Sequence, residues 1–88
     1  MNKIDRGMAC PNGAMIIDVK SAWAEGEKVV LCLWLVDKQE KGVISLRNAD
    51  PYVTWKARLH PDTGEIVTTS GHYFDILSDA VVDFNSRV

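Results

Sequence analysis

The stretch Val29-Val30-Leu31-Cys32-Leu33-Trp34-Leu35-Val36 is apolar at every position. A strand with one face in water alternates apolar and polar residues, so this run predicts a strand that is covered on both faces. Four strands and one helix cover only one face fully. The second cover must come from the N-terminal arm, a curled sheet or another copy of the chain. We expect another copy, and a homodimer interface formed by Trp34, Val30, Cys32 and Val36.

The last third of the chain gives the clearest secondary-structure pattern. Residues 52–59 alternate, with Val53 and Trp55 on one face, which predicts a strand. Residues 60–65 contain Pro and Gly at turn positions and predict a hairpin loop, so residues 66–74 return as an antiparallel strand. Residues 75–88 then carry apolar side chains at helical spacing, with Asp75 as the expected N-cap.

The middle of the chain supplies the remaining strands. Residues 15–23 fit a strand or a helix, and their Ile and Val content favours a strand with Met15, Ile17, Val19 and Trp23 on one face. Residues 37–42 are charged and predict an exposed turn, and residues 43–46 predict a short strand. The expected fold is α+β, with an antiparallel sheet of four strands, or five, and one C-terminal helix packed on one face.

We therefore expect one domain over residues 1–88. It consists of a loose N-terminal arm at 1–12, the sheet within 14–74 and the C-terminal helix at 75–88. The arm is expected to be loose because it has no clean periodicity, and the turn signal Pro11-Asn12-Gly13 separates it from the rest.

Length, charge and cysteine content limit the class of protein. The 88 residues allow a single domain, and the net charge of −2 creates no global field that would hold a polyanion. No apolar segment follows the first residues as in a signal peptide, and the longest apolar run is far shorter than the about 20 residues of a membrane helix. One pair of cysteines is a weak sign of secretion. We expect a cytoplasmic protein in which Cys10 and Cys32 stay reduced.

A pattern in the C-terminal part resembles a known group of sequences. It consists of Tyr52-Val53-Thr54-Trp55, Gly71-His72-Tyr73-Phe74, Ala80, Asp83-Phe84 and Arg87. This pattern resembles a module of uncharacterised small proteins of phages, plasmids and integron gene cassettes, and it covers about residues 52–87. The resemblance implies a strand–hairpin–strand–helix unit and a mobile-element origin. It implies no catalytic residue.

The residues with catalytic potential do not form a recognised motif. His72 follows Gly71, which permits a bulge or a close approach, and we expect His72 to pack against the start of the helix. Ser70 and His72 lie about 7 Å apart on one strand, too far for a nucleophile and its base. The His and Cys residues lack metal-ligand spacing. We expect no enzyme, no metal and no cofactor.

Two surfaces are candidates for a partner. Tyr52, Lys56 and Arg58 form a basic and aromatic strip that could stack single-stranded nucleic acid, although the balanced charge argues against it. Asp79 and Asp83, with Asp75 before them, form an acidic ridge that could meet a basic protein. We expect a non-catalytic interaction module that forms a homodimer and binds a protein partner. The alternatives are a nucleic-acid-binding module, an acidic inhibitor of a host or defence protein, and a small-ligand binder with its pocket between subunits.

Overall fold

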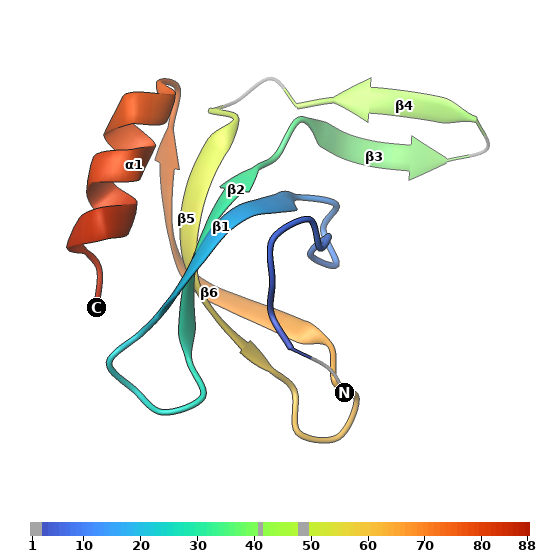
Figure 1. Ribbon diagram of the computed structural model, residues 1–88. Helices are drawn as coiled ribbons and strands as arrows, with labels where there is room; N and C mark the ends of the chain where they lie inside the picture. The colour runs from blue at the N-terminus through green and yellow to red at the C-terminus, as the bar shows by residue number, and fades with distance from the viewer. Residues whose placement is uncertain (1–2, 41, 48–49) are drawn as a thin grey trace.

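The computed structural model describes residues 3–40, 42–47 and 50–88, and these form an α+β fold with a four-stranded antiparallel sheet, a two-stranded hairpin and one helix (Figure 1). The sheet has the strand order β1-β2-β5-β6 and the hairpin joins β3 to β4. In chain order the elements are β1 (Met15–Ser21), β2 (Lys28–Leu33), β3 (Val36–Glu40), β4 (Val43–Leu46), β5 (Tyr52–Leu59), β6 (Ile66–Phe74) and α1 (Leu77–Ser86).

The central strand β2 is covered on both faces by its own chain. Val30 and Cys32 are fully buried in the arm-side core, which we define as the cluster with Ile4, Cys10, Ala14, Ile16, Val53, Trp55, Ala57 and Ile66. Val29 and Leu31 point the other way, into the helix-side core with Ala80 and Phe84. The sequence correctly indicated two covered faces for residues 29–32, but the strand ends at Leu33, and Leu35 in the predicted covered run is 50% exposed. The expectation that another copy of the chain covers the second face of this strand is wrong, because the same chain supplies both covers.

The described part of the N-terminal arm, residues 3–12, provides one of these covers and is bonded to the sheet where a loose arm was predicted, whereas residues 1–2 of that prediction lie outside the described residues. Its backbone is bonded to β1: Gly7 N donates to Ile16 O at 2.8 Å, and Ile16 N donates to Met8 O at 2.9 Å. Ile4 and Cys10 are buried in the arm-side core. The arm lacks periodicity because it lies across the sheet face as irregular backbone, which imposes no regular alternation of buried side chains.

Residues 15–21 form a strand, as the sequence favoured, but the predicted buried face is wrong in its first half. The register between β1 and β2 shifts between Ile16 and Asp18, which marks a β-bulge. Ile16 and Val19 therefore share the arm-side face, whereas Met15 and Ile17 are exposed. Trp23 lies beyond the strand and is 90% exposed.

The strand pair β5–β6 agrees with the sequence pattern. His60 N donates to Glu65 O at 2.7 Å across the connecting loop, and Gly64 has a φ of 73°. In β6, Ser70 and Gly71 both stand opposite Trp55, because Thr54 pairs with His72 and Lys56 pairs with Thr69. This bulge reverses the face on which later β6 side chains lie, so His72 and Phe74 lie on the helix side of the sheet.

The helix begins two residues later than predicted. It runs from Leu77 to Ser86, and its N-cap is Ile76, which has extended backbone and no capping side chain. Asp75 therefore is not the cap, which corrects the sequence prediction. Ala80 and Phe84 are the buried residues of the helix.

The hairpin β3–β4 corrects the predicted turn at 37–42, because residues 37–40 belong to β3; residue 41 lies outside the described residues. Residues 36–40 form a strand that pairs with residues 43–46, and this hairpin projects away from the main sheet (Figure 1). A strand in a projecting hairpin has no core on either side to impose apolar alternation. Its polar sequence is for that reason hard to distinguish from a turn.

Candidate functional site

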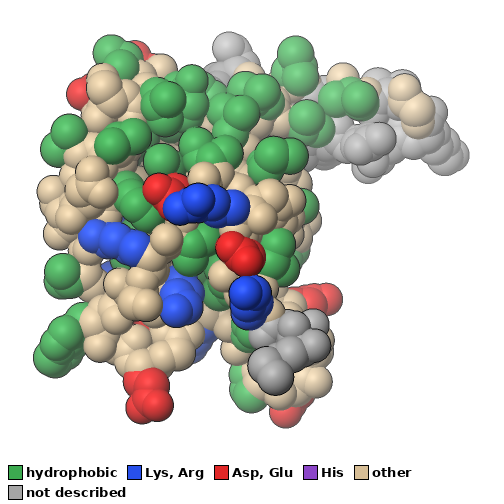
Figure 2. All heavy atoms as spheres, in the orientation of Figure 1, with side chains coloured by type: hydrophobic (Ala, Val, Ile, Leu, Met, Phe, Trp, Pro, Cys, Tyr) green, Lys and Arg blue, Asp and Glu red, His purple; other side chains and the backbone are tan. Residues whose placement is uncertain are grey.

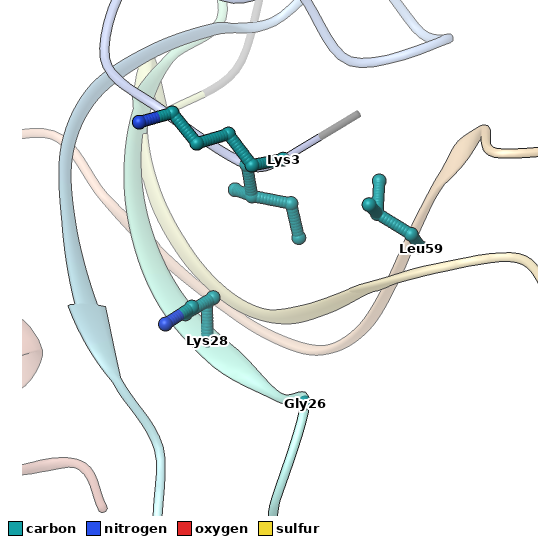
Figure 3. Close-up of a pocket in the computed structure, with 5 residues that line it drawn as sticks. Lys3, Gly26, Lys28 and Leu59 are labelled. Carbon is teal, nitrogen blue, oxygen red and sulfur yellow. The ribbon is translucent and has the colours of Figure 1, made fainter. Parts of the chain in front are cut away.

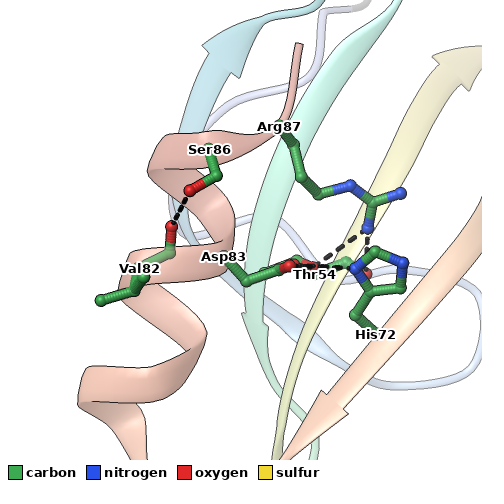
Figure 4. Close-up of polar contacts among 6 residues, drawn as sticks. All are labelled: Thr54, His72, Val82, Asp83, Ser86 and Arg87. Carbon is green, nitrogen blue, oxygen red and sulfur yellow. Dashed lines mark hydrogen bonds and ion pairs between the residues drawn. The ribbon is translucent and has the colours of Figure 1, made fainter.

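A cluster of four polar side chains joins α1 to the sheet (Figure 4). The Thr54 hydroxyl donates to Asp83 Oδ2 at 2.5 Å, and His72 Nδ1 lies 3.0 Å from the same oxygen. Arg87 Nη1 donates both to the carbonyl oxygen and to the hydroxyl oxygen of Thr54, each at 3.0 Å. We call these four residues the helix–sheet clasp.

Each member of the clasp is positioned by a separate feature of the fold. Thr54 is fully buried on the helix side of β5, and His72 is its cross-strand partner on β6. Asp83 lies on the side of α1 that faces the sheet. Arg87 directly follows the last residue of α1, where the backbone becomes extended. Thr54 and Arg87 are 33 residues apart in the chain, so sequence spacing could not have revealed the contact.

The electrostatics of the clasp favour an ionised Asp83. Burial of the carboxyl raises its pKa, but the hydrogen bonds with Thr54 and His72 and the charges of His72 and Arg87 lower it. The net result is a pKa of Asp83 below the ordinary value of an aspartate. The Asp83 side chain is 23% exposed and the His72 side chain 50% exposed, so the clasp has one half-open side.

The clasp has an oriented imidazole, but its other groups serve the fold. In a hydrolytic triad a carboxylate orients the imidazole, which in turn activates a hydroxyl or thiol. Here the Thr54 hydroxyl donates to the carboxylate itself, and the described contacts of His72 include no hydroxyl or thiol group. His72 also meets Asp83 towards the end of α1, not the start of the helix that the sequence indicated. This geometry therefore suits attachment of the helix.

The basic and aromatic strip predicted from Tyr52, Lys56 and Arg58 is not continuous in the structure. Tyr52 packs against the helix-side core, and Lys56 Nζ lies 3.8 Å from a carboxylate oxygen of Glu27. Arg58 is exposed. Because α1 covers this face of β5 at Thr54, bases cannot stack along it as the sequence suggested.

The predicted acidic ridge is also incomplete. Asp75 and Asp79 are exposed, whereas Asp83 turns toward the sheet and is bonded within the clasp. Among the residues that the structure describes, no three His, Cys, Asp or Glu side chains come together in a way that could hold a metal ion.

The predicted interface residues divide into two groups. Val30 and Cys32 are fully buried within the single chain and offer no surface to a partner. Trp34 and Val36 are half-buried at the base of the hairpin. The Trp34 ring packs 5.5 Å from Trp55, lies under the Arg47 guanidinium at 3.8 Å, and donates from Nε1 to Val36 O at 3.1 Å. Trp34 is thus mainly a structural residue of the hairpin base.

The sequence analysis missed the apolar side chains that the hairpin region exposes. Leu35, Ile44 and Leu46 are 50%, 56% and 72% exposed. A sequence signal for them exists, because Ile44 and Leu46 are two residues apart in a strand and so share one face. The predicted strand at residues 43–46 leaves this apolar face without a neighbouring element to cover it.

Both cysteines are free thiols buried in the arm-side core. A hydrogen bond with Cys10 and burial both raise the pKa of Cys32, so this thiol stays protonated. It acts as a small apolar core residue.

Comparisons with known proteins identify no relatives. No protein-family model, no curated protein and no solved structure matches this chain. Within the described residues, no helix has the length and apolar character that crossing a membrane requires.

Proposed function

We propose that this chain is a non-catalytic interaction module that forms a homodimer through the β3–β4 hairpin. The observation that carries the proposal is the exposure of Ile44 and Leu46 on β4, in a hairpin that projects from the sheet, and of Leu35 in the segment just before β3. In Figure 2 the described apolar side chains continue from the body of the molecule to the base of this hairpin. Apolar side chains that gather in this way on a small protein mark interaction surfaces.

The hairpin also has backbone groups that a partner strand can use. A two-stranded hairpin by itself is marginally stable in water, and each of its strands has one unpaired edge. β3 and β4 pair only with each other among the described residues. A partner strand that added to β4 would satisfy one edge and place its own side chains beside Ile44 and Leu46.

A second copy of the chain suits this edge better than an unrelated strand. Two identical edges pair antiparallel about a two-fold axis, which is the symmetry of most homodimers. The net charge of −2 opposes the approach of two copies only weakly. The proposal thus keeps the expected homodimer but places its interface on the hairpin, away from Val30 and Cys32.

The absence of catalysis is part of the proposal. It is supported by the clasp, where the Thr54 hydroxyl and the Asp83 carboxylate bond to each other and not to an open site. The resemblance of residues 52–87 to small mobile-element proteins adds the proposal that the chain originates from such an element. We also propose that it works in the cytoplasm, where its two thiols would stay reduced.

Sedimentation velocity with hairpin variants tests the interface. We expect the wild-type chain to sediment as a dimer, and Ile44→Glu and Leu46→Glu to weaken dimerisation about a hundredfold or more, because each places an unpaired charge in the interface. The matched control is Val82→Glu on α1, which is also an exposed apolar residue at 66% exposure. It should keep the dimer. Far-ultraviolet circular dichroism checks that the variants fold.

Two outcomes would contradict the proposal. In one, the wild-type chain stays monomeric up to its highest attainable concentration. In the other, Ile44→Glu and Leu46→Glu keep the dimer while Val82→Glu loses it, which would assign the interface to the helix.

A further inference from the structure

An open hollow of about 350 Å³ lies where the arm crosses the end of the main sheet (Figure 3). It is lined by Lys3, Ile4, Gly26, Lys28 and Leu59. Ile4 is buried in the arm-side core and Leu59 packs against that core. The hollow is therefore the open end of the arm-side core, with an apolar floor that one chain provides.

Lys28 is the unusual residue of this hollow. It has the same strand parity as Val30 and Cys32, so it occupies the core-facing side of β2 at the first residue of the strand. Its ammonium group donates to Ser21 Oγ at 3.2 Å. A cation at a core-facing position, above an apolar floor, gives the hollow one charged end.

The charged and apolar ends of the hollow are separate. In Figure 3 the ammonium groups of Lys3 and Lys28 lie on one side and Leu59 lies on the other. A second hollow shares Lys3, Ile4 and Lys28 and is lined further by Asp5 and by residues Val19, Lys20 and Ser21 of β1. The Lys3 ammonium meets Asp5 at 3.5 Å, where both side chains are more than half exposed, so water weakens this pair.

We propose that this hollow binds a small anionic amphiphile, a medium-chain carboxylate. The carboxylate lies on the side of the hollow that carries the Lys3 and Lys28 ammonium groups, where a charge-assisted hydrogen bond replaces those of water. The hydrocarbon chain lies over Ile4 toward Leu59. The volume is near the lower end of that of small-molecule sites, which suits one short acyl chain. The sequence placed such a pocket between subunits, whereas this site belongs to a single chain.

The site is independent of the proposed dimer interface. Lys28 begins β2 and Leu59 ends β5, so the hollow lies at one end of these strands. The hairpin connects the opposite ends, Leu33 and Tyr52. Ligand binding and dimerisation can thus be measured, and can fail, separately.

Amide chemical shifts in a titration with sodium octanoate test the site. We expect saturable shifts at Lys3, Gly26, Lys28 and Leu59. Acetate lacks the chain and 1-octanol lacks the charge, so each should bind at least about tenfold more weakly. Lys28→Met, which keeps the apolar stem, should weaken octanoate about tenfold and leave 1-octanol unchanged.

Two further variants keep the test decisive. Lys3→Met should also weaken octanoate, and it perturbs the fold least because Lys3 is 79% exposed. Lys56→Met is the matched control, since Lys56 is a lysine of the neighbouring strand that lies outside the hollow and faces Glu27. It should bind octanoate as the wild type does.

Three results would overturn the proposal. The first is the absence of saturation at octanoate concentrations below those that form micelles. The second is equal affinity for octanoate and 1-octanol, which would show that the lysines hold no head group. The third is a loss of affinity in Lys56→Met as large as in Lys28→Met, which would show a general effect of charge.

Discussion

Gly71 stands at a position where a side chain has no room. A Cβ there would lie 2.6 Å from Trp55 Nε1 and 2.9 Å from Tyr73 Oη. Both rings belong to the packing of the sheet, and they meet edge to face with centroids 6.3 Å apart. The bulge at Ser70, where φ is 55°, brings the Gly71 backbone against Trp55. The residue that the sequence associated with a close approach is thus needed for packing.

We expect Gly71→Ala to lower the free energy of unfolding by about 3 kcal/mol, the upper part of the range for overpacked cores, because Trp55 must move to admit the methyl group. The measurement is urea unfolding followed by tryptophan fluorescence. The control is Gly26→Ala, where φ is 76° but no atom lies within 4 Å, so only backbone strain of about 1 kcal/mol is expected. Equal losses in the two variants would show that Gly71 is not held by packing.

Sequence reasoning correctly predicted the roles of single residues where those roles depend on local backbone geometry. Gly64 in the hairpin loop and Gly71 in β6 were both assigned roles that the structure confirms. It failed for Asp83 and His72, because their roles depend on contacts between elements that sequence spacing does not reveal. Asp83 looked like a solvent-facing member of an acidic repeat, but its side chain turns toward the sheet.

At the scale of elements, the clasp decides how α1 sits on the sheet. Ala80 and Phe84 supply a narrow apolar contact, and the flanking Leu77 and Val81 remain partly exposed. Polar bonds from Asp83 and Arg87 to Thr54 therefore fix the orientation of the helix. The hydrogen bond from Thr54 and the contact with His72 are strongest when the Asp83 carboxylate is ionised, so protonation of Asp83 weakens the clasp.

The pH dependence of stability follows from the lowered pKa of Asp83. A carboxyl whose pKa is lower in the folded chain stabilises the fold fully above the ordinary aspartate pKa, and loses that effect as pH falls through the folded value. Unfolding measured in urea should thus become easier below about pH 4. We expect Asp83→Asn to cost about 1–3 kcal/mol near neutral pH and to reduce this acid dependence.

Asp5 provides the control for this prediction, because its pKa is also lowered, chiefly by a backbone hydrogen bond from Arg6, but its side chain is exposed. Asp5→Asn should change the acid dependence less than Asp83→Asn does. An acid dependence that is the same in wild type and Asp83→Asn would show that the clasp does not depend on the charge of Asp83.

Two bulges explain why the sequence predicted the strands better than their faces. The alternation of β5 is uninterrupted, and Val53 and Trp55, which the sequence placed on one face, both lie on the arm side. β1 and β6 each contain a register shift, after which the buried side chains change parity. A bulge is set by pairing with a neighbouring strand, so an isolated strand pattern does not reveal it.

At the scale of the whole molecule, the arm and the helix cover the two faces of β2, whereas the described apolar side chains of β4 remain exposed. The fully apolar sequence of residues 29–32 needs no second chain, since all four side chains are buried by the arm and α1. The apolar side chains that remain exposed lie later in the chain, at Leu35, Ile44 and Leu46. The fold class was predictable from sequence periodicity. The arm as the cover of the second face of β2 was not predictable, because the arm sequence has no periodicity.

Amide hydrogen exchange of the wild-type chain at low and high protein concentration tests this division most directly. We expect the amides of β2 to be equally protected at both concentrations, because their covers belong to the same chain. The amides of β4 should gain protection only at high concentration, when a second copy adds to the edge. Protection of β2 that rises with concentration, together with β4 amides that never become protected, would contradict both halves of the account.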